Sequence, residues 1–183
     1  MHCTTHTDAP AHVIEGAPFI DEVPLKSSFG NAVCVDISKE RWEVITPEDL
    51  ENDRPEIQPG DIVILHTGWH KYYGDNTKYF IYSPSLYREA GEWFVGKGVK
   101  GTGYDHQTLD HPLGTKIRWG ADPICPFTID EHKKETGRHP GEDCPDWEPC
   151  HRLLLGNGIV GFENVGGDID KVVGKRFAVA AFP

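Results

Sequence analysis

The segment Asp61-Ile-Val-Ile-Leu-His-Thr-Gly-Trp69 decides the fold class of this chain. From Asp61 to His66 it is a continuous apolar run, which is typical of a central strand buried on both faces of a sheet. Pro59-Gly60 favours a turn just before the run. We therefore expect a buried central strand with Thr67-Gly68-Trp69 directly at its carboxyl end.

Further elements are expected on both sides of this strand. Residues 32–37, 99–104 and 159–163 have the composition of strands, and residues 177–183 read as a strand cut at its end. Helices are expected from Thr46-Pro47, over 83–95 with a Ser83 or Ser85 cap, and over 150–155. The polar stretch 106–150, rich in proline and glycine, predicts long loops. This mixture predicts an α/β domain with a mixed sheet and flanking helices, and leaves the strand order open.

Composition limits the possible function classes. A chain of 183 residues forms one domain, here 1–183, and its net charge of -11 argues against a nucleic-acid partner. No apolar run reaches the length of a membrane span. Five cysteines without a regular framework indicate reduced thiols in a cytoplasmic protein. Unpaired thiols are favoured over a zinc knuckle at Cys144 and Cys150. Because the chain opens inside a chemical motif, we also expect segments to be missing at both ends.

The first dozen residues carry that motif, His2-Cys-Thr-Thr-His6-Thr-Asp8-Ala-Pro-Ala-His12. Imidazole and carboxylate groups are the ligands that hold zinc or manganese. Pro10 and the threonines disfavour a helix. In a straight strand His2 and Asp8 would lie about 20 Å apart, too far for one ion. A bent loop with His2, His6 and Asp8 as metal ligands is therefore predicted, with His12 in an outer layer or in proton transfer.

A second pair of residues, His151 and Glu163, brackets a helix, a glycine turn and a strand. The strand can carry the chain back toward His151 and place Glu163 beside it. A carboxylate that closes an apolar strand is costly to bury unless it is paired. On these residues alone, a functional pair and a structural salt bridge both remain open.

Together the two constellations resemble the metal-dependent hydrolases of the cyclase family, which include kynurenine formamidase, the arylformamidase of tryptophan catabolism, and isatin hydrolase. The family signature is His-x-Gly-Thr-His-x-Asp-x-Pro-x-His, and residues 2–12 match it except at Thr4, where the signature has glycine. The segment 61–69, the segment 101–110 with its Asp105, and the His151…Glu163 pair also match. The resemblance implies a swivelling β/β/α domain that assembles into homodimers or homotetramers.

The resemblance also implies roles for single residues. His2, His6 and Asp8 would hold a first divalent ion, and Asp8, His151 and Glu163 would surround a second in two-metal members. His12 would be the catalytic histidine. The implied cofactor is therefore one or two divalent ions per subunit, with zinc preferred and manganese the alternative.

These observations predict metal-assisted hydrolysis of a small molecule: a cyclic amide, a lactone or an aryl formamide. His12 would take a proton and return it to the leaving group. Backbone amides near Thr67 and Gly68 are candidate oxyanion or substrate contacts. The aromatic residues that follow the central strand either stack on a flat substrate or belong to the core: Trp69, Tyr72, Tyr73 and Phe80.

Two other functions stay open. One is a polyketide cyclase or dehydratase, and the other is a non-catalytic metal-binding member of the family. The sequence has no Gly-x-Ser-x-Gly elbow and no Gly-x-Gly-x-x-Gly motif after a strand, so a serine hydrolase and a nucleotide cofactor are disfavoured.

Overall fold

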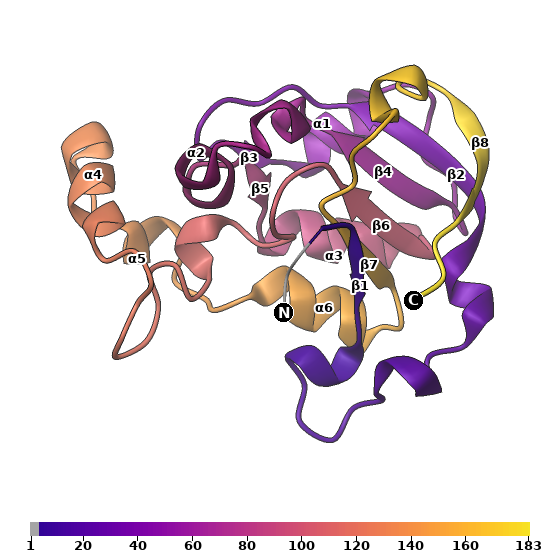
Figure 1. The fold of residues 1–183 in the computed structure, drawn as a ribbon, viewed down its shortest axis with the longest axis horizontal. Helices are drawn as coiled ribbons and strands as arrows, with labels where there is room; N and C mark the ends of the chain where they lie inside the picture. The colour runs from indigo at the N-terminus through magenta and orange to yellow at the C-terminus, as the bar shows by residue number, and fades with distance from the viewer. Residues whose placement is uncertain (1–3) are drawn as a thin grey trace.

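The computed structural model describes residues 4–183, except the side chain of Asn76, as an α/β domain built on a six-stranded mixed sheet (Figure 1). The strand order is β1-β7-β6-β4-β2-β8, with the four inner strands parallel and the two edge strands antiparallel to their neighbours. The strands are β1 His6–Asp8, β2 Phe29–Asp36, β3 Val44–Ile45, β4 Ile62–His66, β5 Ser85–Leu86, β6 Gly101–Tyr104, β7 Val160–Glu163 and β8 Arg176–Ala180. Strands β3 and β5 form a separate parallel pair. The predicted fold class is confirmed.

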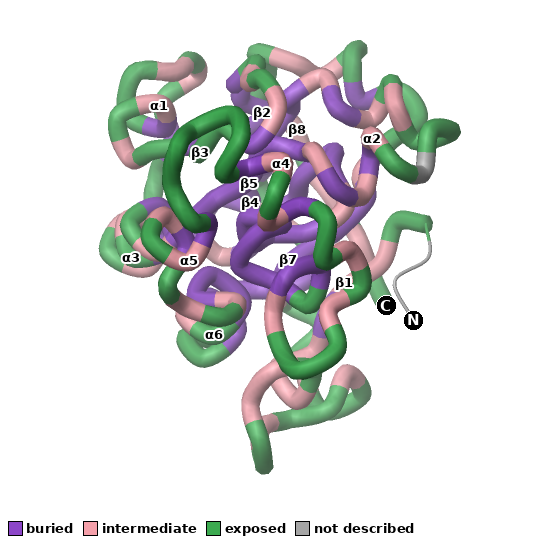
Figure 2. The backbone as a smooth tube through the Cα atoms, turned by 90° about the vertical axis from the view of Figure 1, so that its left-hand side faces the viewer, coloured by how far each residue is buried: buried purple, intermediate pink, exposed green. Residues whose placement is uncertain are grey.

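The central strand explains why its sequence is apolar throughout. All five residues of β4 are buried, and neighbours along the strand point to opposite faces of the sheet. Val63 and Leu65 belong to the core under the helices, whereas Ile62 and Ile64 belong to a second core on the other face. In Figure 2 the inner strands accordingly form the buried centre of the molecule.

The α-helices are α1 Pro47–Asn52, α2 Asn76–Ile81, α3 Arg88–Lys97, α4 Phe127–Thr136, α5 Pro140–Asp143 and α6 Pro149–Gly156. As predicted, Thr46 caps α1: its hydroxyl accepts a hydrogen bond from the Asp49 amide at 3.3 Å. The prediction for α3 began too early. Ser85 lies in β5 instead, where its hydroxyl donates to the Thr108 carbonyl at 3.0 Å. No helix in the described part of the chain is long and apolar enough to cross a membrane.

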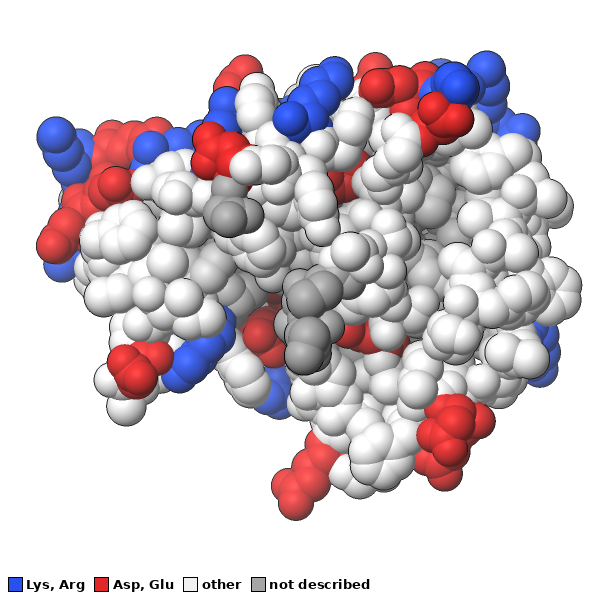
Figure 3. Space-filling view, in the orientation of Figure 1, with Lys and Arg blue, Asp and Glu red and all other residues white. Residues whose placement is uncertain are grey.

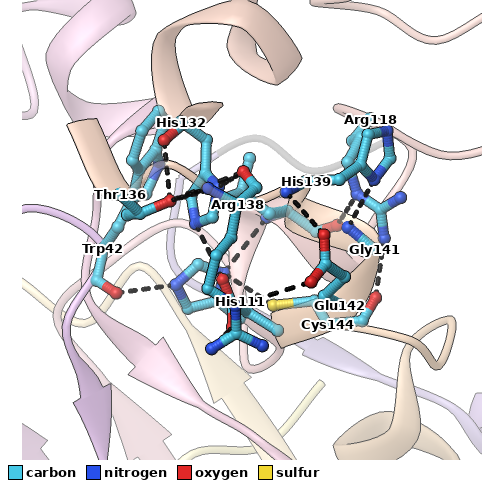
Figure 4. A network of polar contacts seen from close by, with 12 residues as sticks. Trp42, His111, Arg118, His132, Thr136, Arg138, His139, Gly141, Glu142 and Cys144 are labelled. Atoms are coloured by element: carbon cyan, nitrogen blue, oxygen red, sulfur yellow. Dashed lines mark hydrogen bonds and ion pairs between the residues drawn. The ribbon is translucent and has the colours of Figure 1, made fainter. Parts of the chain in front are cut away.

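The prediction of loops over 106–150 was wrong in part, because α4, α5 and the start of α6 lie in this stretch. Residues 112–148, which contain helices α4 and α5 and the loops around them, form an arm that extends away from the sheet (Figure 1). A network of polar contacts holds this arm together instead of an apolar stripe (Figure 4). Arg118 Nη2 donates to the Cys144 carbonyl at 2.7 Å, and His132 Nε2 lies 3.4 Å from Asp143 Oδ2. Cys144 and Cys150 are buried free thiols.

The parallel strands end together at one edge of the sheet. Their last residues are Asp36 of β2, His66 of β4, Tyr104 of β6 and Glu163 of β7. Because β1 runs antiparallel to β7, its first residue, His6, also reaches this edge beside Glu163. Imidazole, carboxylate and phenol groups are therefore gathered along the carboxyl edge, where ligand sites of open α/β sheets usually lie.

Candidate metal centre

Three elements bring the predicted ligands together. His6 and Asp8 are two residues apart on β1, so their side chains share a face of the strand. The pairing of β1 with β7 sets His6 opposite Glu163. His151 comes from the first turn of α6, and it is buried.

The ring nitrogens and carboxylate oxygens of these residues converge within a few ångströms. Glu163 lies between the two imidazoles, with its Oε2 3.2 Å from His6 Nε2 and its Oε1 3.2 Å from His151 Nε2. The carboxylate of Asp8 also contacts both imidazoles, at longer distances: its Oδ1 is 3.7 Å from His6 Nε2 and its Oδ2 is 3.5 Å from His151 Nε2.

The other nitrogen of each ring is already engaged. His6 Nδ1 lies 2.9 Å from the Thr4 carbonyl, and His151 Nδ1 lies 2.7 Å from Asp110 Oδ2. Carbonyl and carboxylate oxygens only accept, so each Nδ1 carries a hydrogen. In a neutral ring Nε2 then presents a lone pair toward the carboxylates of Asp8 and Glu163. Such an arrangement needs a cation between the groups.

Protons or a metal ion can supply that charge. The hydrogen bond to Glu163 raises the pKa of His6 to about 8. Burial alone would lower the pKa of His151, but its hydrogen bonds to Asp110, Asp8 and Glu163 outweigh burial and raise it well above the usual value. Asp8 Oδ2 is buried, and its contact among the described residues is the long one to His151 Nε2 at 3.5 Å. Two imidazoles and two carboxylates match the charge and the ligand types of a divalent ion, so the site fits one.

Two overlapping groups could each hold an ion. The first is His6, Asp8 and Glu163, and the second is Asp8, His12 and His151; within each group the ligand atoms lie within 4.8 Å of one another. Asp8 belongs to both groups. His12 is an exposed residue of the 3-10 helix η1 (Pro10–His12), with its ring centroid 5.7 Å from that of His151. The predicted ligand His2 lies outside the described residues.

Asp110 and Tyr104 were missed by the sequence reasoning. Fully buried Asp110 accepts hydrogen bonds from the amides of Cys150 at 2.8 Å and His151 at 3.0 Å, in addition to the His151 ring. Asp110 therefore has two roles: it accepts hydrogen bonds from amides in the first turn of α6, and it orients the imidazole ring of His151. The Tyr104 hydroxyl donates to Glu163 Oε1 at 3.2 Å, and burial raises the pKa of Tyr104 well above its usual value. No local pattern marks Asp110, because its partners follow it by 40 and 41 residues.

A cavity of about 660 Å³ opens beside this centre. Its lining combines the histidines of the second group with residues of α2, of the loop after β6 and of the arm: His12, Thr77, Phe80, Ile81, Gln107, Thr108, Thr115, Lys116, Ile117, Ile124, Cys125, Glu148 and His151. In the space-filling view, acidic side chains are visible inside a recess between the arm and the sheet (Figure 3). The volume suits a small-molecule ligand.

The oxyanion contacts expected near the central strand are not available. The amides of Thr67 and Gly68 donate to the carboxylate of buried Asp105, each at 2.9 Å. Of the aromatic residues proposed for substrate stacking, Trp69 is buried in the core, and Phe80 lines the cavity. The loop after β4 is thus held by Asp105 instead of offering donors to a substrate.

The chain is similar to known proteins in sequence and in fold. Residues 1–111 match the family model Cyclase, described as "Putative cyclase". An uncharacterized protein of Haemophilus influenzae is 30% identical over 100 residues, which are 54% of this chain and 66% of that protein.

Among solved structures, isatin hydrolase A from Ralstonia solanacearum has a TM-score of 0.68 and 22% identity, over 96% of this chain and 64% of that one. An isatin hydrolase bound to the product analogue thioisatinate has a TM-score of 0.64 and 21% identity, over 91% and 60%. A potential metal-dependent hydrolase with cyclase activity has a TM-score of 0.57 and 19% identity, over 89% and 62%. The chain thus spans less than two thirds of the length of each of these relatives.

Proposed function

This chain belongs to the cyclase family, and on that premise we propose that it is a metal-dependent hydrolase of a cyclic amide, a lactone or an aryl formamide. The observation that carries the proposal is the convergence of two ring nitrogens on the carboxylates of Asp8 and Glu163, beside an open cavity. His6, Asp8, His151 and Glu163 would hold the metal, with His2 as a further candidate. Zinc is the first choice and manganese the alternative, because nitrogen and oxygen ligands suit both.

A bound divalent ion lowers the pKa of water and polarises a carbonyl group. The protein holds the ligands in position through their outer partners. Asp110 and the Thr4 carbonyl fix the two rings with Nε2 facing inward, and Tyr104 with the Leu109 amide holds Oε1 of Glu163. Because these partners are set before a substrate arrives, little reorganisation is needed during the reaction.

His12 is the proposed proton carrier. It lines the cavity next to His151, and its exposed position allows exchange with solvent. An imidazole titrates near neutral pH, so His12 can take a proton from the attacking water and return it to the leaving nitrogen or oxygen.

The cavity favours a flat substrate that has one polar edge. The side chains of Phe80, Ile117 and Ile124 form an apolar part of the cavity wall, whereas Gln107 adds a polar group to it. In the described structure Gln107 Oε1 is buried without a hydrogen-bond partner. It can accept a hydrogen bond from the N–H of a cyclic amide or formamide, which a lactone lacks.

The proposal is tested by metal analysis of the purified chain, paired with hydrolysis assays on isatin, N-formylkynurenine and a dienelactone before and after chelation. We expect stoichiometric zinc or manganese, and turnover that disappears with chelator and returns when metal is added. Folded protein that takes up no metal and stays inactive with added zinc or manganese would contradict the proposal.

A further inference from the structure

A second histidine–aspartate cluster lies at the same edge of the sheet, outside the proposed active site. It contains His66, the last residue of β4, His70 of the 3-10 helix η4 (Trp69–Tyr72) and Asp170 of the 3-10 helix η6 (Ile169–Lys171). Asp170 Oδ1 lies 3.0 Å from His66 Nε2, and its Oδ2 lies 3.4 Å from His70 Nε2. The three side chains thus offer two nitrogens and a carboxylate within 4.8 Å of one another.

The opposite nitrogen of each ring is held by its own carboxylate. His66 Nδ1 lies 2.8 Å from Asp36 Oδ1, and His70 Nδ1 lies 2.9 Å from Asp105 Oδ2. Since carboxylates only accept, both Nδ1 atoms carry hydrogens. Each neutral ring therefore turns the lone pair of Nε2 toward Asp170. This is the carboxylate–histidine arrangement that orients imidazole ligands of metal ions.

The inner partner of His70 is rigidly set. Asp105 is fully buried, and it also accepts hydrogen bonds from the Thr67 amide at 2.9 Å, the Thr67 hydroxyl at 2.6 Å and the Gly68 amide at 2.9 Å. These bonds fix the turn between the two histidines. The positions of His66 and His70 are thus determined by the strand end and by this turn, before any ion binds.

A cation is needed between the ring nitrogens and Asp170. Protonation of both rings would supply it, but would place two positive rings with centroids 5.4 Å apart. One divalent ion supplies the same charge to both rings at once. The side chain of Asp170 is 59% exposed, so water can reach the cluster and complete the coordination of an ion.

We propose that His66, His70 and Asp170 form a second binding site, for a divalent transition ion of the zinc type, distinct from the buried centre at β1, β7 and α6. Asp36 and Asp105 orient the two rings. The occupied site joins η6 to the end of the central strand. Because Ile169 beside Asp170 is buried in the core on that face of the sheet, the ion holds the connection between β7 and β8 in place.

The test is a zinc titration of the chelator-treated, dialysed full chain, with binding followed by calorimetry. The variants Asp170→Asn and His70→Gln are compared with Asp168→Asn, a matched control on the same segment whose side chain is 79% exposed and pairs with Lys171. We expect one equivalent of zinc to bind at least tenfold more weakly in the first two variants and unchanged in the control. Asp36→Asn should weaken the same equivalent by roughly 10- to 100-fold, as loss of an orienting partner does.

The same titration in Glu163→Gln separates the two centres, because that substitution removes a ligand of the buried one only. Zinc that still binds to Glu163→Gln, and is lost when Asp170→Asn is added, supports the second site even if no hydrolysis is found. Equal zinc stoichiometry and affinity in the wild type, Asp170→Asn and His70→Gln would overturn the proposal and leave the cluster as a proton-stabilised ion-pair network.

Discussion

Two short segments of the chain, Thr4-Thr5-His6 and Gly68-Trp69-His70, share a backbone feature but have different surroundings. The first residue of each segment has a left-handed backbone conformation, with φ 60° at Thr4 and φ 77° at Gly68. In both segments the histidine, His6 or His70, has its Nδ1 next to an oxygen acceptor while its Nε2 faces a carboxylate. The facing carboxylate of Glu163 is fully buried, whereas that of Asp170 is mostly exposed.

This difference shows that the local backbone conformation alone does not define the chemistry of the histidine. A buried carboxylate and imidazole must be neutralised together, because the interior solvates charge poorly. At the exposed cluster water can share that task. We therefore expect the buried centre to retain its ion more firmly and the exposed site to exchange with the medium.

The largest effect is expected for Glu163→Gln, which replaces the carboxylate shared by the rings of His6 and His151. Turnover should fall by more than the roughly 100-fold typical of losing an outer partner. The buried centre should lose its metal while the exposed cluster keeps zinc. Activity assays and metal analysis check this, with Glu92→Gln on the surface of α3 as the control. Normal metal content and turnover would remove Glu163 from the centre.

His12→Ala should lower turnover by roughly 10²- to 10⁴-fold, the range for loss of a general acid–base group. Metal content of both clusters should stay unchanged, because the proposed role of His12 is proton transfer. The measurement is kcat together with metal stoichiometry. Metal loss in this variant would instead make His12 a ligand, as its closeness to Asp8 and His151 also permits.

The next prediction compares the two carboxylates that orient histidine rings, Asp110 at the buried centre and Asp36 at the exposed cluster. Asp110→Asn and Asp36→Asn should each weaken metal binding at their own cluster by about 10- to 100-fold. Only Asp110→Asn should also destabilise the fold, by about 1.5–3 kcal/mol, because buried Asp110 accepts two amides of α6. Denaturant unfolding of both variants measures this. Equal stability losses would contradict the assigned difference in environment.

The smallest effect concerns the first residues of the two segments, Thr4 and Gly68. Thr4 adopts a left-handed conformation that is strained for a β-branched residue, whereas Gly68 adopts it freely. Thr4→Gly should stabilise the protein by about 1 kcal/mol, and Gly68→Thr should destabilise it by at least as much. Thermal or denaturant unfolding gives both values. A destabilised Thr4→Gly would show that contacts of the threonine outweigh the strain.

The sequence predicted the parts of the molecule in which local pattern and tertiary structure agree. The apolar run of β4 and the Thr46-Pro47 start of α1 are set locally, and the fold brings His6, Asp8, His151 and Glu163 close to one another. The arm was missed because α4 buries only Thr128 and His132, so it has no apolar period. The second cluster was missed because Asp170 follows His66 by 104 residues. The role of Asp110 was not predicted for the same reason, because its partners in α6 are 40 and 41 residues away in the sequence.

The arm separates two properties of the site that many enzymes combine in the same residues. Its side chains Ile117, Ile124 and Cys125 form part of the cavity wall, yet no member of either histidine–carboxylate cluster comes from residues 112–148. Substitution of the cavity-lining side chains Ile117 and Ile124 is therefore expected to alter which molecules fit while the metal-binding residues stay in place. The shape of the substrate cavity and the supply of metal ligands are thus assigned to different parts of the chain.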